Sequence, residues 1–225
     1  FNPAVIRDPA DVDDVDSYLL AGICPAGDID IVDDNYLNLD TRTIEGYDVG
    51  VYYDAETSFG EFNLKFVGSF YDKYEQNGDS GVAAEVQTAL ESGELPDWIT
   101  SLRGYGDLLQ REGNMKEKYH ASVRWSHKDW GAYLSMLHKG KFYDADTAIV
   151  VDGQTLNWWL PAMTTYNASV DYRFDAFGSN TRVRFGVNNL TDERAPICDC
   201  RFGYWSDAHS DYGRQFFVDL MARFD

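Results

Sequence analysis

The stretch TYNASVDYRF (residues 165–174) decides the fold, because apolar and polar side chains alternate along its whole length. Its apolar face carries Tyr166, Ala168, Val170, Tyr172 and Phe174, and its other face carries only polar and charged side chains. Alternation with a period of two is typical of a β-strand with one buried or lipid-covered face. Strands in soluble proteins average about 5–6 residues, whereas a strand that crosses a membrane needs about 9–11. The stretch therefore predicts a membrane-spanning strand.

Six further stretches show the same alternation. They are residues 45–54, 60–71, 118–126, 130–139, 182–188 and 213–224. Aromatic side chains make up 15% of the chain and gather near the ends of the apolar faces, as in the aromatic girdles of outer-membrane barrels. A soluble β-sandwich also alternates, so it remains the alternative, but it rarely needs strands this long.

The connections between these strands alternate in length. Short links fall at residues 55–59, 127–129 and 175–180, and long ones at about 72–115, 142–161 and 191–212. Short periplasmic turns facing long extracellular loops are the arrangement of outer-membrane barrels. Bacterial barrels have an even number of strands, and an open sheet would leave unpaired edges in lipid. The seven strands of residues 41–225 therefore predict the C-terminal part of a larger antiparallel transmembrane β-barrel.

The alternation also predicts which side chains face lipid and which face the lumen. The expected lipid-facing residues include Tyr166, Val170, Tyr172, Phe185, Phe216 and Leu220. The expected lumen-facing residues include Asn167, Asp171, Arg184 and Asp219. Each set has one parity on its strand, and hydrocarbon does not tolerate the charged set.

The charge of the chain is strongly acidic and unevenly placed. The 19 Lys and Arg against 38 Asp and Glu give a net charge of −19, which excludes nucleic acid as a partner. Residues 1–40 hold ten Asp and one Arg, and they predict a solvated acidic loop region on the long-loop side, leading into the barrel. Within it, Asp11, Asp13, Asp14 and Asp16 offer oxygen ligands for structural calcium, although the central Gly and distal Glu of an EF-hand are missing. A calcium site and a solvated loop both stay open, and no other cofactor is expected.

Four segments resemble TonB-dependent outer-membrane receptors. They are FNPAVIRDPAD (1–11), NLDTRTIEGYDVGVYYDAETSFGEFNLKFVGSFY (38–71), RVRFGVNNLTDERAP (182–196) and GRQFFVDLMARF (213–224). The third is similar to the family's Gly-Val-x-Asn-Leu-x-Asp-x-x-Pro signature, and the fourth to its closing strand. The resemblance implies the C-terminal third of a 22-stranded barrel in the outer membrane of a Gram-negative bacterium. The plug domain and TonB box lie N-terminal in the family and are expected to be absent from this chain.

The resemblance also implies a function. The expected protein is a transporter rather than an enzyme, and it captures a scarce nutrient: an iron chelate, a vitamin or an oligosaccharide. Uptake would pass through a plugged barrel driven by the TonB system. The implied partners are membrane lipid and lipopolysaccharide, the remaining N-terminal barrel and plug segment, TonB through that plug, and the small nutrient ligand. The alternative is a soluble or surface-exposed β-sandwich that binds glycans through its loop aromatics.

Aromatic side chains in the long loops are the candidate ligand contacts. The rings are Trp158, Trp159, Tyr204, Trp205 and Tyr212, accompanied by the polar residues Asp207, His209 and Asp211. Aromatic rings are enriched at binding sites, where they stack on sugar rings or chelates, and the polar groups would hydrogen-bond or contact a metal. The same rings would equally serve as the upper girdle or as loop packing.

The three cysteines allow several pairings. Cys198 and Cys200 are expected to form a tight disulfide in an oxidising extracellular loop, which leaves Cys24 for another partner; alternatively, one of them pairs with Cys24. A metal site made by Cys198, Cys200 and His209 is weaker, because zinc motifs usually separate their cysteines by two to four residues.

The sequence Gly78-Asp79-Ser80-Gly81 is similar to the nucleophile motif of serine proteases. It stands in a long polar loop and opens a helical pattern over residues 82–90. Ser80 is therefore expected to cap a helix rather than to act as a nucleophile.

Overall fold

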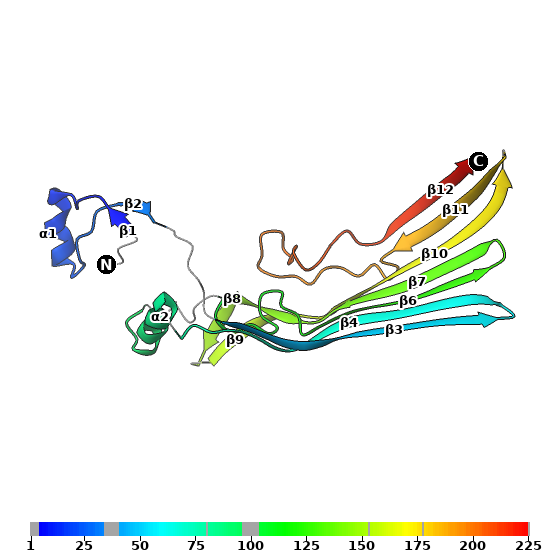
Figure 1. Cartoon of the computed structure of the whole chain (residues 1–225). Helices are drawn as coiled ribbons and strands as arrows, with labels where there is room; N and C mark the ends of the chain where they lie inside the picture. The colour runs from blue at the N-terminus through cyan, green and yellow to red at the C-terminus, as the bar shows by residue number, and fades with distance from the viewer. Residues whose placement is uncertain are drawn as a thin grey trace. The chain divides into compact units, whose positions relative to one another are not determined.

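The computed structural model describes residues 5–33, 41–79, 81–95, 104–152, 154–176 and 178–224. The chain divides into two compact units, Phe1–Leu39 and Asp40–Asp225. The larger unit is dominated by one antiparallel sheet, in which the long strands lie side by side in their order along the chain (Figure 1). Its strands are β3 (Arg42–Thr57), β4 (Gly60–Gln76), β6 (Glu117–His127), β7 (Trp130–Lys139), β10 (Met163–Ala176), β11 (Ser179–Asn188) and β12 (Gln215–Phe224).

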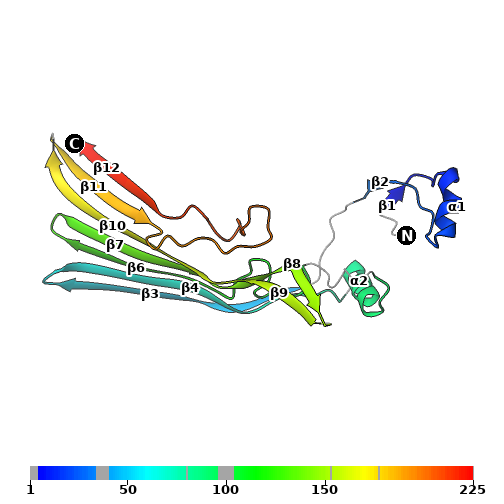
Figure 2. The same ribbon diagram turned by 180° about the vertical axis from the view of Figure 1, so that it is seen from behind.

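All seven predicted strands are confirmed, and so is their antiparallel arrangement. The short strand β5 (Gly106–Asp107) adds two residues to the edge of the sheet beside β4. The tight turns after β3, β6 and β10 lie at one end of the sheet, and the long connections lie at the other (Figure 2). The sheet therefore has a short-turn end and a long-loop end, as the link lengths predict.

The two faces of the sheet differ as the alternation predicts. Val170 lies between Phe185 of β11 and Ala132 of β7, and 48% of Val170 and 53% of Phe185 are exposed. No second sheet among the described residues packs on this apolar face. The β-sandwich alternative is therefore wrong for this part of the chain, because a sandwich would bury these side chains.

The opposite face carries a charged cluster around Asp171, which is only 2% exposed. One oxygen of its carboxylate lies 3.6 Å from Nη2 of Arg124 and 3.9 Å from Nε of Arg184. Gly131 is directly opposite Asp171 on β7, and a Cβ on that glycine would lie 2.8 Å from the carboxylate. The small residue gives the carboxylate room against the sheet, so this face is polar and ion-paired.

The sheet is open, with β3 and β12 at its two edges. Within the described residues, these two strands do not pair with each other. In a bilayer, unpaired backbone groups along a strand edge are costly, so a barrel wall continues on both sides of such a sheet. The open sheet agrees with a section of a larger barrel and not with a small closed barrel.

The acidic N-terminal unit is not simply loop, which corrects the prediction for residues 1–40. It contains the strand pair β1 (Val5–Arg7) and β2 (Ile29–Val32), and the helix α1 (Val12–Leu20). Asp11 caps the helix, since its carboxylate accepts a hydrogen bond from the backbone N–H of Asp13 at 3.0 Å. Acidic residues stabilise the positive end of a helix dipole, so the same aspartates that suggest a solvated loop also favour a helix start.

The long connections contain structure of their own. The helical pattern at residues 82–90 is confirmed as α2 (Gly81–Glu91), while its expected cap, Ser80, lies outside the described residues. The predicted loop 142–161 is instead largely a hairpin of β8 (Phe142–Val151) and β9 (Gln154–Leu160). Its register shifts between Asp144 and Ile149, and that irregularity hides the alternation in the sequence. No helix of the described residues is long and apolar enough to cross a membrane.

Candidate ligand-binding site

Two long connections meet in an aromatic cluster at the loop end of the sheet. Phe142 and Leu160, which are opposite each other in the β8–β9 hairpin, are fully buried against Cys198. The ring of Trp205 meets Phe142 edge-on at 5.5 Å between centroids, and the ring of His209 stacks on it at 5.6 Å. The base of the β8–β9 hairpin therefore packs on the last loop, and we call Phe142, Leu160, Cys198, Trp205 and His209 the loop cluster.

The loop cluster divides the predicted ligand-contact rings into two groups. Trp205 packs against Phe142 and Tyr204 is half-buried, whereas Trp158, Trp159 and Tyr212 are exposed. The indole N–H of Trp158 donates to the carbonyl oxygen of Ile197 at 3.2 Å, and Trp159 lies against Tyr143, with ring centroids 5.1 Å apart. The exposed rings remain candidates for ligand contact, while Trp205 is used for packing.

His209 is 3% exposed, and within the described residues neither of its ring nitrogens has a hydrogen-bond partner. Burial foremost, together with the nearby charge of Lys139, lowers the pKa of His209 to about 4. The imidazole is therefore neutral at neutral pH and adds no positive charge to the site.

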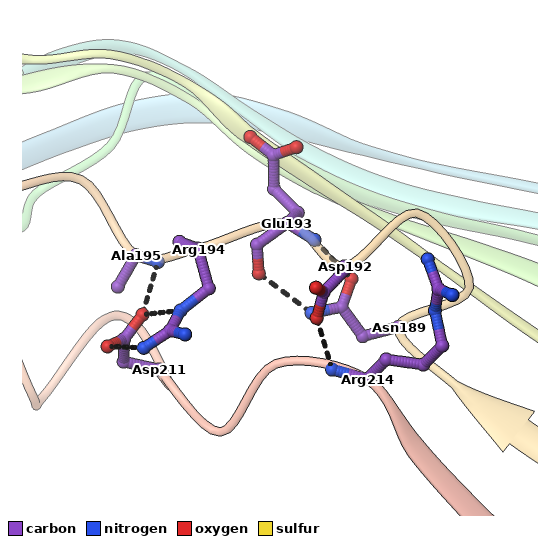
Figure 3. Close-up of polar contacts among 7 residues, drawn as sticks. All are labelled: Asn189, Asp192, Glu193, Arg194, Ala195, Asp211 and Arg214. Carbon is purple, nitrogen blue, oxygen red and sulfur yellow. Dashed lines mark hydrogen bonds and ion pairs between the residues drawn. The ribbon is translucent and has the colours of Figure 1, made fainter.

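Asp211 is bonded within its own loop, and its expected contact with a ligand stays a prediction (Figure 3). Its two carboxylate oxygens accept hydrogen bonds from Nε of Arg194 at 2.8 Å and from Nη2 at 2.5 Å. The backbone N–H of Ala195 donates to the same carboxylate at 2.9 Å. These bonds, those from Arg194 foremost, lower the pKa of Asp211 to about 2. Its acceptor positions are largely taken by its own loop.

The Asn189-Leu190-Thr191-Asp192 segment ties the last loop to the sheet (Figure 3). The side-chain amide of Asn189 donates to the carbonyl of Glu193 at 2.7 Å and accepts from its N–H at 2.9 Å. Asp192 accepts from the backbone N–H of Arg214 at 2.7 Å, just before β12. Asn189 and Asp192 have φ values of 54° and 59°, a left-handed conformation that Asn and Asp tolerate better than most residues. The motif thus fixes both ends of the loop that carries residues 197–212.

A cavity of 580 Å³ opens beside the loop cluster, on the same face of the sheet as Arg124 and Asp171. Its polar lining comes from Ser69, Tyr71, Tyr74, Asn114, Lys118, Lys139 and Asp207. The ammonium of Lys139 donates to the carbonyl of Ala208 at 2.5 Å, which joins β7 to the last loop. Of the predicted contact residues, Asp207 lines this cavity; Trp158, Trp159 and Tyr212 do not. A separate apolar depression of 420 Å³ lies on the lipid-facing side, around Leu134 and Val170.

The sequence analysis missed the two lysines of this cavity. Lys118 and Lys139 have the parity of the lumen face on β6 and β7, and they are directly opposite each other in the sheet. Parity alone would place both on that face, but pairing them requires the register between the strands. Only the structure shows that Asp207 and Ala208 of the last loop line the same cavity as these lysines.

The cysteines and the acidic N-terminal residues show no metal site within the described part of the chain. Cys198 and Cys200 form a disulfide, and Cys24 is a free, exposed thiol. The disulfide takes up both thiols of the alternative metal site with His209. Among the described side chains, no group of three or more His, Cys, Asp or Glu is placed to hold a metal ion. The side chain of Asp14 lies outside the described residues, and a calcium site at Asp11, Asp13, Asp14 and Asp16 stays a prediction.

A single open sheet of long strands, apolar on one face and charged on the other, defines the wall of a transmembrane β-barrel. The chain belongs to the TonB dependent receptor-like, beta-barrel family, whose model matches residues 6–190. One similar solved structure is that of the ferric citrate transporter FecA in the unliganded form, with 11% sequence identity and a TM-score of 0.40. That similarity covers 94% of this chain and 33% of the transporter, so this chain spans about a third of its length. No curated protein matches the chain.

Proposed function

We propose that this chain is part of a bacterial outer-membrane receptor that takes up a scarce nutrient, with energy supplied by the TonB system. The observation that carries the proposal is the family match over residues 6–190 on a sheet with one lipid-compatible face. In this proposal, lipid and lipopolysaccharide surround the outer face, and the barrel is completed by segments outside this chain. The plug segment that contacts TonB also lies outside it.

The long-loop end is the proposed site of ligand capture. The exposed rings of Trp158, Trp159 and Tyr212 and the cavity beside the loop cluster all belong to long connections or to the strand ends next to them. Flat aromatic faces stack on sugar rings or on the organic part of an iron chelate or vitamin, and each such ring adds about 0.5–1.5 kcal/mol beyond its buried area. The tight braces at Asn189 and Asp211 would hold this surface in one conformation, which reduces the entropy cost of binding.

Uptake by the intact receptor in its native bacterium tests the proposal. The receptor gene is deleted, and uptake of radiolabelled iron chelates, cobalamin and oligosaccharides is measured against the wild type and against a strain that lacks TonB. We expect one ligand class to be lost in both mutant strains and restored when the receptor gene is returned. Receptor-dependent uptake that continues without TonB would contradict the energised mechanism and indicate a passive pore.

A further inference from the structure

Two lysines face each other across neighbouring strands in the cavity beside the loop cluster. Lys118 of β6 and Lys139 of β7 are direct register partners, and both line the cavity of 580 Å³. Like charges placed directly opposite each other destabilise a sheet. The pair is notable in this chain because acidic residues outnumber basic ones by 38 to 19. A negative group bound between the two ammonium groups would relieve this repulsion.

The protein does not supply that counter-charge within the described residues. Their other register neighbours are uncharged: Ser69 is opposite Lys118, and Met163 is opposite Lys139. No described carboxylate lies within 4.0 Å of either ammonium, although Asp207 lines the same cavity. Asp48, farther along the same row of the sheet, accepts a hydrogen bond from the hydroxyl of Ser69.

Some other cations of the larger unit are paired with acids, whereas Arg173 and Arg182 are, like the two lysines, direct register partners of equal charge. Lys73 lies 2.8 Å from Glu75, Arg194 binds Asp211, and Arg124 and Arg184 share Asp171. Lys118 and Lys139 have no such acid among the described residues, and both line the same cavity, so both charges are available to a ligand.

The geometry also holds one of the two ammonium groups in place. Lys139 is half-buried, and its bond to the carbonyl of Ala208 fixes the ammonium at the cavity wall. An ammonium has three donor hydrogens, so that bond leaves two free. Lys118 is more exposed and reaches the same cavity from the next strand. One ammonium held at the cavity wall beside a more exposed one suits an incoming acceptor group.

We propose that Lys118 and Lys139 form a subsite for carboxylate groups of an anionic ligand. The inference rests on the proposed receptor function and names the ligand's charge. With Asp207 in the lining, the three charged side chains sum to +1, which matches one carboxylate better than a phosphate, whose charge is about −1.5 to −2. The volume lies within the range of about 300–1,000 Å³ for small-ligand pockets. Two sources present such groups: an acidic oligosaccharide and a carboxylate chelate of iron.

Equilibrium binding to the purified intact receptor in detergent tests the subsite with two matched probe pairs. Trigalacturonate is compared with its fully methyl-esterified form, which has the same rings and no charge. Iron(III)–malate is compared with the neutral iron(III) tris-acetohydroxamate complex. We expect the acid member of one pair to bind at least tenfold more tightly than its neutral partner, and to weaken as salt is raised. The pair that behaves in this way identifies the source of the carboxylate.

Lysine variants connect that preference to the subsite. Lys118→Met and Lys139→Met are each expected to weaken the acid probe about tenfold and to leave the neutral probe unchanged, since a hydrogen bond to a charged group is worth about that factor. Lys118→Arg keeps the charge and should retain most of the binding. Lys65→Met is the matched control, because Lys65 has the same lumen-facing parity on β4, opposite Ser122, and does not line the cavity. Assembly of every variant is verified by its heat-modifiable migration on gels.

The outcomes separate this inference from the proposed function. The subsite is refuted if neither acid probe is preferred over its neutral partner, or if Lys65→Met weakens binding as much as the cavity variants. Energised uptake of an uncharged nutrient that is insensitive to both lysine changes would leave the receptor function intact and refute the subsite. Lysine-dependent binding of an acid probe, without TonB-dependent uptake of any nutrient, would support the subsite and contradict the receptor function.

Discussion

The main sheet and the loop cluster differ in how their apolar side chains are kept from water. In the sheet, the parity of a residue fixes its face, so Val170 and Phe185 share the lipid-facing surface because their strands pair in register. In the loop cluster, Phe142, Leu160 and Cys198 come from separate parts of the chain and are buried by one another. The sheet therefore depends on the bilayer as its apolar partner, and the cluster depends on its own small core.

The two regions also satisfy polar groups differently. On the lumen face of the sheet, Asp171 finds its cations, Arg124 and Arg184, on other strands. In the last loop, Asp211 binds an arginine 17 residues earlier and a backbone N–H beside it. The sheet uses neighbours set by register, whereas the loop uses neighbours set by its own turns. Changes in one region should therefore leave the other largely intact.

The largest effect is expected from emptying the small core. Phe142→Ala removes a fully buried ring, and changes of this kind cost about 3–5 kcal/mol. We expect proteases to cut residues 142–161 and 197–212 rapidly in this variant, while the barrel keeps its heat-modifiable migration. Phe202→Ala, which removes an exposed ring of the loop between β11 and β12, is the control and should change little. Equal protease resistance in both variants would show that the loops do not depend on Phe142.

Charge on the lipid face should have the next largest effect, and it acts on the sheet alone. Val170→Arg is expected to cost about 2–4 kcal/mol if Val170 lies near the bilayer midplane, because the guanidinium would sit in hydrocarbon. Ser169→Arg places the same side chain on the lumen face and should cost much less. Urea unfolding of the receptor in lipid vesicles measures both. Similar stability of the two variants would contradict the assigned faces of β10.

Acid should weaken the loop cluster through His209. Its pKa is lowered to about 4 in the folded protein, against about 6.5 in an unfolded chain. The unfolded state therefore binds a proton first, so stability is complete above about pH 6.5 and falls as the pH drops toward 4, by at most about 3 kcal/mol. Asp211, with a pKa of about 2, keeps its arginine throughout this window.

Hydrogen exchange of residues 200–212, corrected for the intrinsic effect of pH, measures this change. Opening should increase between pH 6.5 and 4 in the wild type and stay constant in His209→Phe, which keeps a ring beside Phe142 but has no titrating group. The same pH dependence in both proteins would assign the effect to another residue.

The smallest effect is expected from the exposed rings. Trp158→Ala combined with Tyr212→Ala should weaken ligand binding by about tenfold or more, since two stacking contacts of about 0.5–1.5 kcal/mol each are lost. Trp205 is unsuitable for this test, because its ring packs on Phe142 and its removal would disturb the loop itself. Equilibrium binding to the assembled receptor is the measurement. Unchanged affinity would assign both rings to the membrane interface or to loop packing.

Several features of the fold were readable from the chain without its structure. The alternation around residues 165–174 predicts both a strand and its two faces, and the helical pattern over residues 82–90 predicts α2. The hairpin at Phe142–Leu160 escaped prediction because its register shifts near Asp144. The helix α1 escaped because aspartates favour both solvated loops and helix starts.

The sequence by itself determined the strands, their faces and the two ends of the sheet, because a period of two is a local property that any pairing must respect. Only the tertiary structure decided the use of the loop residues. Trp205 became a packing residue, Asp211 a brace and Lys118 a neighbour of Lys139 through contacts between residues that are not adjacent in the chain. Such contacts follow from strand register and loop closure, which no local pattern of side chains specifies.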